Sequence, residues 1–253
     1  MLSENLIRQD NIKKNNNMLS SNIDNKYICN RKIVIEIRFV SNFSIIDKRG
    51  QLLDSLLKLD NFKNKYGSMN MSRILAGNGS DEDSCTTTFA VYHNRISYIS
   101  SKIDSVESFY SLFDKAYQIV LGIIGNIDVL RIGCRTLGTY TVKENDFNQI
   151  LHKFIKAFPN NFFFDDFEPK DLCFQLQHDK GMYRIGPINK NDNFLAEEFS
   201  NSECKKHVGI AIDADNFITN SKEAINDKKL IKDVYLYALS VEKTLYERVS
   251  SLF

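Results

Sequence analysis

Hydrophobic and polar residues alternate over residues 32–40, where the odd positions are isoleucine or phenylalanine and the even positions include Glu36 and Arg38. A period of two that uses β-branched residues predicts a half-buried strand, whose polar side should face solvent or a partner. From Asp47 the period changes, and leucines recur at helical spacing to about Tyr66. This region therefore predicts a strand followed by a helix.

The next elements are separated by clear turn signals. Residues 76–84 are mostly turn formers and acids, which predicts a loop. Residues 86–92 and 95–100 read as two strands, and the two residues between them are the loop length of a tight hairpin. Asp104 is expected to cap a helix that runs to Gly122, with Glu107 completing a capping box. Residues 129–135 predict another strand, and a further helix should run from Asp146 until Pro159 ends it.

This order predicts an α+β protein with a mostly antiparallel sheet. Up to residue 160 it is β-α-β-β-α-β-α, which resembles a ferredoxin-like split βαβ unit. Beyond the Phe-rich acidic loop of residues 161–169, three more strands are expected at 171–178, 182–187 and 207–213, and they either extend the first sheet or form a second one. A long C-terminal helix over 222–253 carries an apolar stripe that would cover the sheet or pair with another subunit.

These elements divide the chain into three parts. Residues 1–28 are polar and are expected to form a flexible leader. Residues 29–160 form the first α+β half. Residues 161–253 add strands and the C-terminal helix, and should pack with the first half as one unit.

Composition narrows the class of protein. The chain has 253 residues, of which 43% are hydrophobic and 26% charged, as is typical of globular proteins with a buried core. A formal charge of +1 counts against nucleic acid as a partner. Five scattered cysteines without a CxxC pair indicate reduced thiols, and no stretch approaches the roughly 18 apolar residues of a membrane span. With no secretory signal at Met1, we expect a cytoplasmic protein with no membrane association.

Three segments together resemble a known family. Residues 129–138, read VLRIGCRTLG, are similar to the strand motif of a sporadically distributed, uncharacterised bacterial protein family with an RIGLRY-type strand, and residues 33–39 resemble its opening E-x-R-F strand. Residues 210–213 and the terminal helix with Val241 and Glu242 resemble its closing strand and helix. The chain departs from the pattern at Cys134, where leucine is typical, and at Thr136 and Leu137, where tyrosine and isoleucine are typical. The resemblance implies no catalytic residues, because the family has no agreed activity.

Two sets of charged residues are candidates for chemistry. Asp213 and Asp215 end an apolar strand, and paired carboxylates at this spacing can hold Mg²⁺ or supply a nucleophile and an acid, although their late position in the chain favours a strand-end turn. Arg131, Arg135 and Arg184 lie within otherwise apolar strands. Because Arg131 and Arg135 are four residues apart, they should share one sheet face.

Together with Glu36 and Arg38, such a face could be a polar groove for an acidic ligand or a salt-bridged surface of little energetic importance. The preferred hypothesis is a non-catalytic interaction or ligand-binding protein that needs no cofactor and that binds a protein partner or itself. The family resemblance links it to bacterial stress response or phage defence. The alternative is a metal-dependent hydrolase or transferase that uses Asp213 and Asp215.

Overall fold

The computed structural model describes residues 23–63, 65–157, 171–199, 204–219 and 228–253. The expected leader up to residue 22, the Phe-rich acidic loop and the first residues of the expected C-terminal helix lie outside these ranges. None of the helices within them combines the length and the apolar character that are needed to cross a bilayer.

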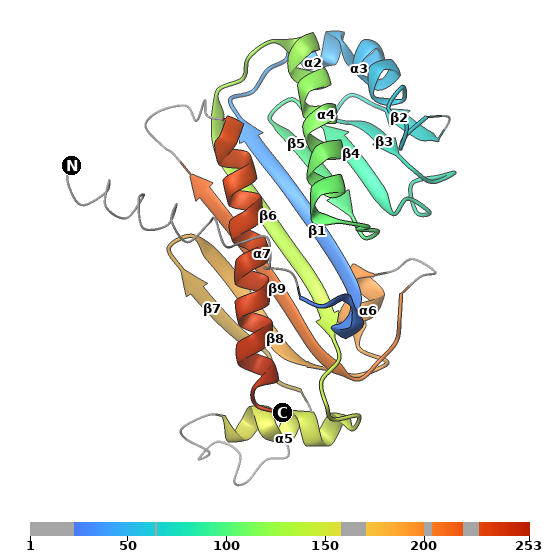
Figure 1. The fold of residues 1–253 in the computed structure, drawn as a ribbon. Helices are drawn as coiled ribbons and strands as arrows, with labels where there is room; N and C mark the ends of the chain where they lie inside the picture. The colour runs from blue at the N-terminus through green and yellow to red at the C-terminus, as the bar shows by residue number, and fades with distance from the viewer. Residues whose placement is uncertain (1–22, 64, 158–170, 200–203, 220–227) are drawn as a thin grey trace, which may run out of the picture.

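An antiparallel sheet of nine strands forms the centre of the described structure, in the order β2-β3-β4-β5-β1-β6-β9-β8-β7 (Figure 1). The strands are β1 (Ile28–Phe39), β2 (Tyr66–Met69), β3 (Ile74–Gly77), β4 (Thr87–Val91), β5 (Arg95–Ser100), β6 (Val129–Tyr140), β7 (Phe174–His178), β8 (Gly181–Ile188) and β9 (Gly209–Thr219). The strands of the second part thus extend the first sheet, because β9 pairs with β6. This decides between the two arrangements that the sequence left open.

The helices are short except for two. They are α2 (Ser44–Asp47), α3 (Arg49–Leu56), α4 (Val106–Ile124), α5 (Phe147–Lys156), α6 (Asn193–Glu198) and α7 (Lys228–Ser250), with a 3-10 turn, η2, at Asn25–Tyr27. The long helices α4 and α7 lie across the same face of the sheet (Figure 1). We call this the helix face and the opposite side the open face.

The largest core cluster lies under these two helices. The odd-numbered residues of β1 from Ile33 to Phe39 are at most 2% exposed and pack there, which confirms the predicted period-two strand. The apolar stripe of α7 belongs to the same cluster, through Ile231, Tyr235 and Leu239 among others. Of the two expectations for the C-terminal helix, covering the sheet is confirmed.

The first half differs from the expectation at two helix boundaries. The leucine-rich helix ends at Leu56 and not near Tyr66, and a hairpin of β2 and β3, which the sequence did not predict, lies between the expected end of the helix and the start of the expected loop. Asn70 builds the turn of this hairpin, because its side-chain oxygen accepts hydrogen bonds from the backbone N–H groups of Ser72 and Arg73. Helix α4 is capped by Ser105 rather than Asp104, since the Ser105 hydroxyl accepts from the backbone N–H of Ser108.

The second part differs at β9. This strand continues to Thr219, so Asp213 and Asp215 lie inside it and the expected strand-end turn is wrong. Aspartate is disfavoured in strands, which is why the sequence suggested an end at this point. Helix α6 was not anticipated. The hairpin of β4 and β5 and the start of a helix at Asp146, which caps α5, are both confirmed.

A buried ion pair joins α7 to the sheet. The guanidinium of Arg31 on β1 donates to both carboxylate oxygens of Glu242 on α7, and the Tyr140 hydroxyl on β6 donates to the same carboxylate. The exposed fractions of the Arg31 and Glu242 side chains are only 10% and 1%. Burial, the largest single influence, lowers the pKa of Arg31, but the charge and hydrogen bonds of Glu242 together with Tyr140 and Tyr235 outweigh it, and the net change is upward.

Candidate functional site: the open face of the sheet

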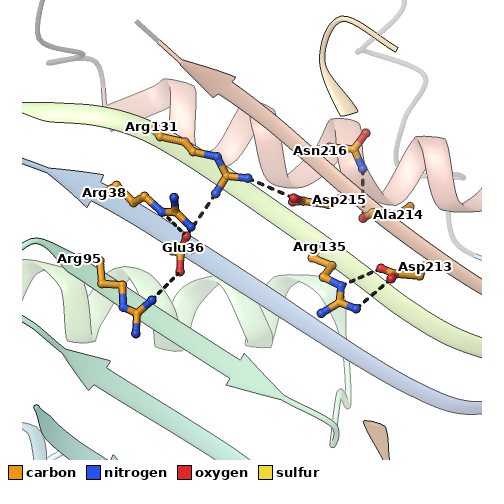
Figure 2. A network of polar contacts seen from close by, with 9 residues as sticks. All are labelled: Glu36, Arg38, Arg95, Arg131, Arg135, Asp213, Ala214, Asp215 and Asn216. Carbon is orange, nitrogen blue, oxygen red and sulfur yellow. Dashed lines mark hydrogen bonds and ion pairs between the residues drawn. The ribbon is translucent and has the colours of Figure 1, made fainter. Parts of the chain in front are cut away.

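Charged side chains gather on the open face, in the middle of the sheet (Figure 2). Strand register explains this arrangement, because Arg38 pairs with both Arg95 and Arg131, and Arg135 pairs with Asp215. Residues that are opposite one another on paired strands point to the same face. We define the arginine face as Glu36, Arg38, Arg95, Arg131, Arg135, Asp213 and Asp215.

Three guanidinium groups converge on the carboxylate of Glu36. Its Oε1 accepts from Arg38 Nε at 2.7 Å and from Arg131 Nη1 at 3.2 Å, while Oε2 lies 3.8 Å from Arg95 Nη1. Arg131 also donates to Asp215 Oδ2 at 3.1 Å, so it bridges two carboxylates. Without Glu36 the directly opposed arginines would repel one another, so this carboxylate makes the cluster possible.

Aromatic rings hold two of these arginines in place. The Arg131 guanidinium lies 4.7 Å from the centre of the Phe217 ring, and that of Arg95 lies 4.1 Å from the centre of the Tyr92 ring. Guanidinium groups stack favourably on aromatic faces. Arg131 is therefore fixed by a ring and two carboxylates, and only 18% of its side chain is exposed.

Gly133 gives Arg131 the space to lie across β6. A Cβ atom at residue 133 would be 3.0 Å from Arg131 Nη1 and 3.2 Å from its Cζ, so even alanine would press on the guanidinium. Arg131 pairs with Thr219, and Asp215 lies four residue pairs further along the β6–β9 ladder, two beyond Phe217, the partner of Gly133. The ion pair between Arg131 and Asp215 thus passes over the one position where a side chain would obstruct it.

A second group of charges lies further along the same strands. Arg135 binds Asp213 with two parallel hydrogen bonds, Nε to Oδ1 at 2.7 Å and Nη2 to Oδ2 at 2.8 Å. Arg135 Nη2 also lies 3.3 Å from Oε1 of Glu198 on α6, whose Oε2 accepts from Lys32 Nζ at 2.9 Å. The pKa of Arg135 is raised, chiefly by the hydrogen bonds to Asp213 and against the effect of burial.

The arginine face is hollowed by a groove with a volume of about 510 Å³. Five cationic side chains line it, those of Lys32, Arg38, Arg95, Arg131 and Arg135, against three carboxylates, those of Glu36, Asp215 and Glu198. The lining therefore carries an excess of two positive charges, although the chain as a whole is nearly neutral. A guanidinium group has five N–H donors, so the arginines have more donors than these carboxylates can accept.

Asp213 and Asp215 do not form a shared site in the structure. Each carboxylate is engaged by an arginine, Asp213 by Arg135 and Asp215 by Arg131. Glu36 does come near Asp215, but the Arg131 guanidinium lies between their carboxylates (Figure 2). Within the part of the chain that the structure describes, no group of three or more acids, histidines and cysteines is placed to hold a metal ion.

Sequence reasoning correctly placed Arg131, Arg135, Glu36 and Arg38 on one face. Arg184 is opposite Asp213 on the paired strands β8 and β9 and so points to the same face, but it lines a smaller hollow of about 160 Å³ and not the main groove.

Three further charged residues of the site, Lys32, Arg95 and Glu198, were not predicted. Lys32 and Arg95 follow the same period-two alternation as their neighbours and could have been found that way. No sequence pattern pointed to Glu198, because it reaches the site only through the way in which the folded chain brings α6 onto the sheet.

Comparisons of this chain with protein-family models and with curated proteins find no match.

Proposed function

We propose that this protein is a binding protein whose arginine face holds an anionic ligand with phosphate or carboxylate groups. The convergence of Arg38, Arg95 and Arg131 on the single carboxylate of Glu36 carries this proposal. An oxyanion that enters the groove would meet N–H donors that Glu36 leaves without acceptors. Forked guanidinium donors match phosphate and carboxylate oxygens better than any other side chain does.

The shape of the groove supports the same conclusion. Its volume of about 510 Å³ lies in the range of small-molecule sites, which is roughly 300–1,000 Å³. Arg131 is already ordered by Phe217 and by two carboxylates, so little side-chain entropy is lost when a ligand binds. The anionic group could belong to a small molecule or to an acidic segment of a protein partner. A role in bacterial stress response or phage defence stays a prediction from the family resemblance.

The predicted ferredoxin-like split βαβ unit would be the scaffold of this site. We infer that the strands from β1 to β6 contain a split βαβ unit, into which the β2–β3 hairpin is inserted. In support, β4, β5, β1 and β6 are neighbours in that order, with α4 on one face. The groove lies on the opposite face of these strands.

Calorimetric titration with two probes, inorganic tripolyphosphate and a glutamate-rich peptide, tests the proposal. The wild-type protein should bind at least one of them, and Arg131→Gln should weaken that binding at least tenfold, because a hydrogen bond to a charged group contributes about 1.5–3 kcal/mol. Tighter binding of tripolyphosphate would indicate a small-molecule ligand, and tighter binding of the peptide would indicate an acidic segment of a protein partner.

Arg73→Gln is the matched control. It removes the same charge, but Arg73 pairs with Glu82 outside the groove, at 2.8 Å. Its affinity should equal that of the wild type. The proposal is wrong if neither probe binds, or if the Arg131 and Arg73 variants bind equally well.

A further inference from the structure

Glu198 enters the groove from outside the sheet. It is the last residue of α6, a helix of six residues, and its carboxylate spans two neighbouring strands by pairing with Lys32 of β1 and Arg135 of β6. Within the part of the chain that the structure describes, Lys32 forms an ion pair with Glu198. Without this carboxylate, the Lys32 ammonium and one edge of the Arg135 guanidinium would face the groove without a counter-charge.

The carboxylate can leave without disturbing α6. The helix is anchored by Leu195 and Phe199, which are 3% and 5% exposed and pack with Leu137 and Ile188 in a small apolar cluster. The Glu198 side chain itself is 28% exposed. A change of its rotamer would therefore release both cations while the apolar contacts of α6 remain.

Glu198 resembles a bound anion in its charge as well. Burial raises the pKa of its carboxyl group, but the hydrogen bonds and charges of Lys32 and Arg135 outweigh burial, and the net change is downward. The group is thus ionised at neutral pH. It holds the same kind of contacts that a phosphate or carboxylate of a ligand would make.

We propose that Glu198 occupies a second anion subsite, and that the natural ligand carries a second anionic group that displaces it to pair with Lys32 and Arg135. This inference rests on the proposed function, in which the first anionic group binds at Arg38, Arg95 and Arg131. The two subsites are about four residues apart along β6, which corresponds to about 13 Å. The ligand class is therefore an extended molecule with two anionic groups at about this separation.

The test compares Glu198→Gln with Glu197→Gln, using inorganic phosphate as the probe for each subsite. Both variants lose one negative charge from neighbouring residues, so they change the overall field of the protein almost equally. Glu197 is exposed and lies outside the groove lining, so it serves as the matched control. We expect Glu198→Gln to bind one more phosphate per chain than the wild type, and Glu197→Gln to bind the same number as the wild type.

Two further measurements make the assignment specific. Adding Lys32→Gln to the Glu198→Gln variant should remove the additional phosphate and leave the first one bound. The affinity of Glu198→Gln for dodecanedioate, an extended dicarboxylate long enough to reach both subsites, should rise about fivefold, because a partly exposed ion pair of at most about 1 kcal/mol no longer has to be broken.

The outcomes separate this inference from the proposed function. If Glu198→Gln and Glu197→Gln bind equal amounts of phosphate while the wild type binds tripolyphosphate through Arg131, only the second subsite is refuted. If the wild type and every variant bind no anionic probe, the proposed function fails as well. A circular dichroism melt of each variant checks that the fold is intact.

Discussion

Replacing Glu242 with leucine is expected to weaken the attachment of α7 to the sheet. The Glu242 carboxylate is 1% exposed and accepts hydrogen bonds from Arg31 and Tyr140. Leucine has a similar volume, so the change tests the polar contacts rather than the packing. It leaves a guanidinium group, with only 10% of the Arg31 side chain exposed, without its counter-charge.

The expected loss is about 4 kcal/mol in the free energy of unfolding, since removing one partner of a buried ion pair costs about 3–5 kcal/mol. This is a large share of the roughly 5–15 kcal/mol by which a domain is stable. Tyr140→Phe should cost less, about 2 kcal/mol, because it removes one hydrogen bond to a charged group and leaves the ion pair intact.

Urea unfolding monitored by circular dichroism measures these values, provided that the slope against denaturant stays constant. A double variant, Arg31→Met with Glu242→Leu, should recover most of the loss, because an apolar pair of similar size can replace a buried ion pair. The reasoning is refuted if Glu242→Leu costs less than about 1 kcal/mol, or if the double variant is no more stable than the single one.

Three other predictions follow from particular contacts. Gly133→Val should weaken the binding of tripolyphosphate about tenfold in the same titration, because its Cβ would press on the Arg131 guanidinium at 3.0–3.2 Å; unchanged affinity would contradict this role. Gly138→Ala should destabilise the protein by about 1–3 kcal/mol in urea unfolding, since its Cβ would be 2.2 Å from the buried Tyr140 hydroxyl oxygen; wild-type stability would show that Tyr140 can move away. Burial lowers the pKa of His207, so the unfolded chain binds the proton more readily, and the free energy of unfolding should fall as the pH drops below about 6.5. His207→Gln should reduce this fall between pH 7 and 5.5, and an unchanged pH profile would exclude His207 as its source.

Alternation along single strands made much of the sheet predictable. It identified β1, β4, β5 and β6, and it placed Arg131 and Arg135 on one face before any pairing was known. Each of these inferences depends on local geometry, in which the side of a residue follows from its position in the strand. The ends of the helices and the position of the hairpin at Asn70 depend on local hydrogen bonds in turns, which hydrophobic periodicity does not reveal.

The ion pairs of the site were not predictable in the same way. Arg135 meets Asp213 diagonally and Arg131 reaches Asp215 across Gly133, so both contacts depend on the register between β6 and β9. These strands are separated by many residues in the sequence. A pair of aspartates near the apparent end of a strand gives no sign that arginines from another strand neutralise it, and Glu198 joins the site only because α6 folds over the sheet.

The middle of the sheet is built from segments that are distant in sequence, and this bears on how the protein folds during synthesis. Strand β6 is paired on one side with β1 and on the other with β9, which leaves the ribosome about 70 residues after β6 is complete. Non-local pairing of this kind slows folding. Until β9 emerges, the twelve-residue β6 presents an unpaired edge, the arrangement that most readily recruits strands from other chains. A nascent chain stalled before Gly209 should therefore depend on a chaperone to stay out of aggregates.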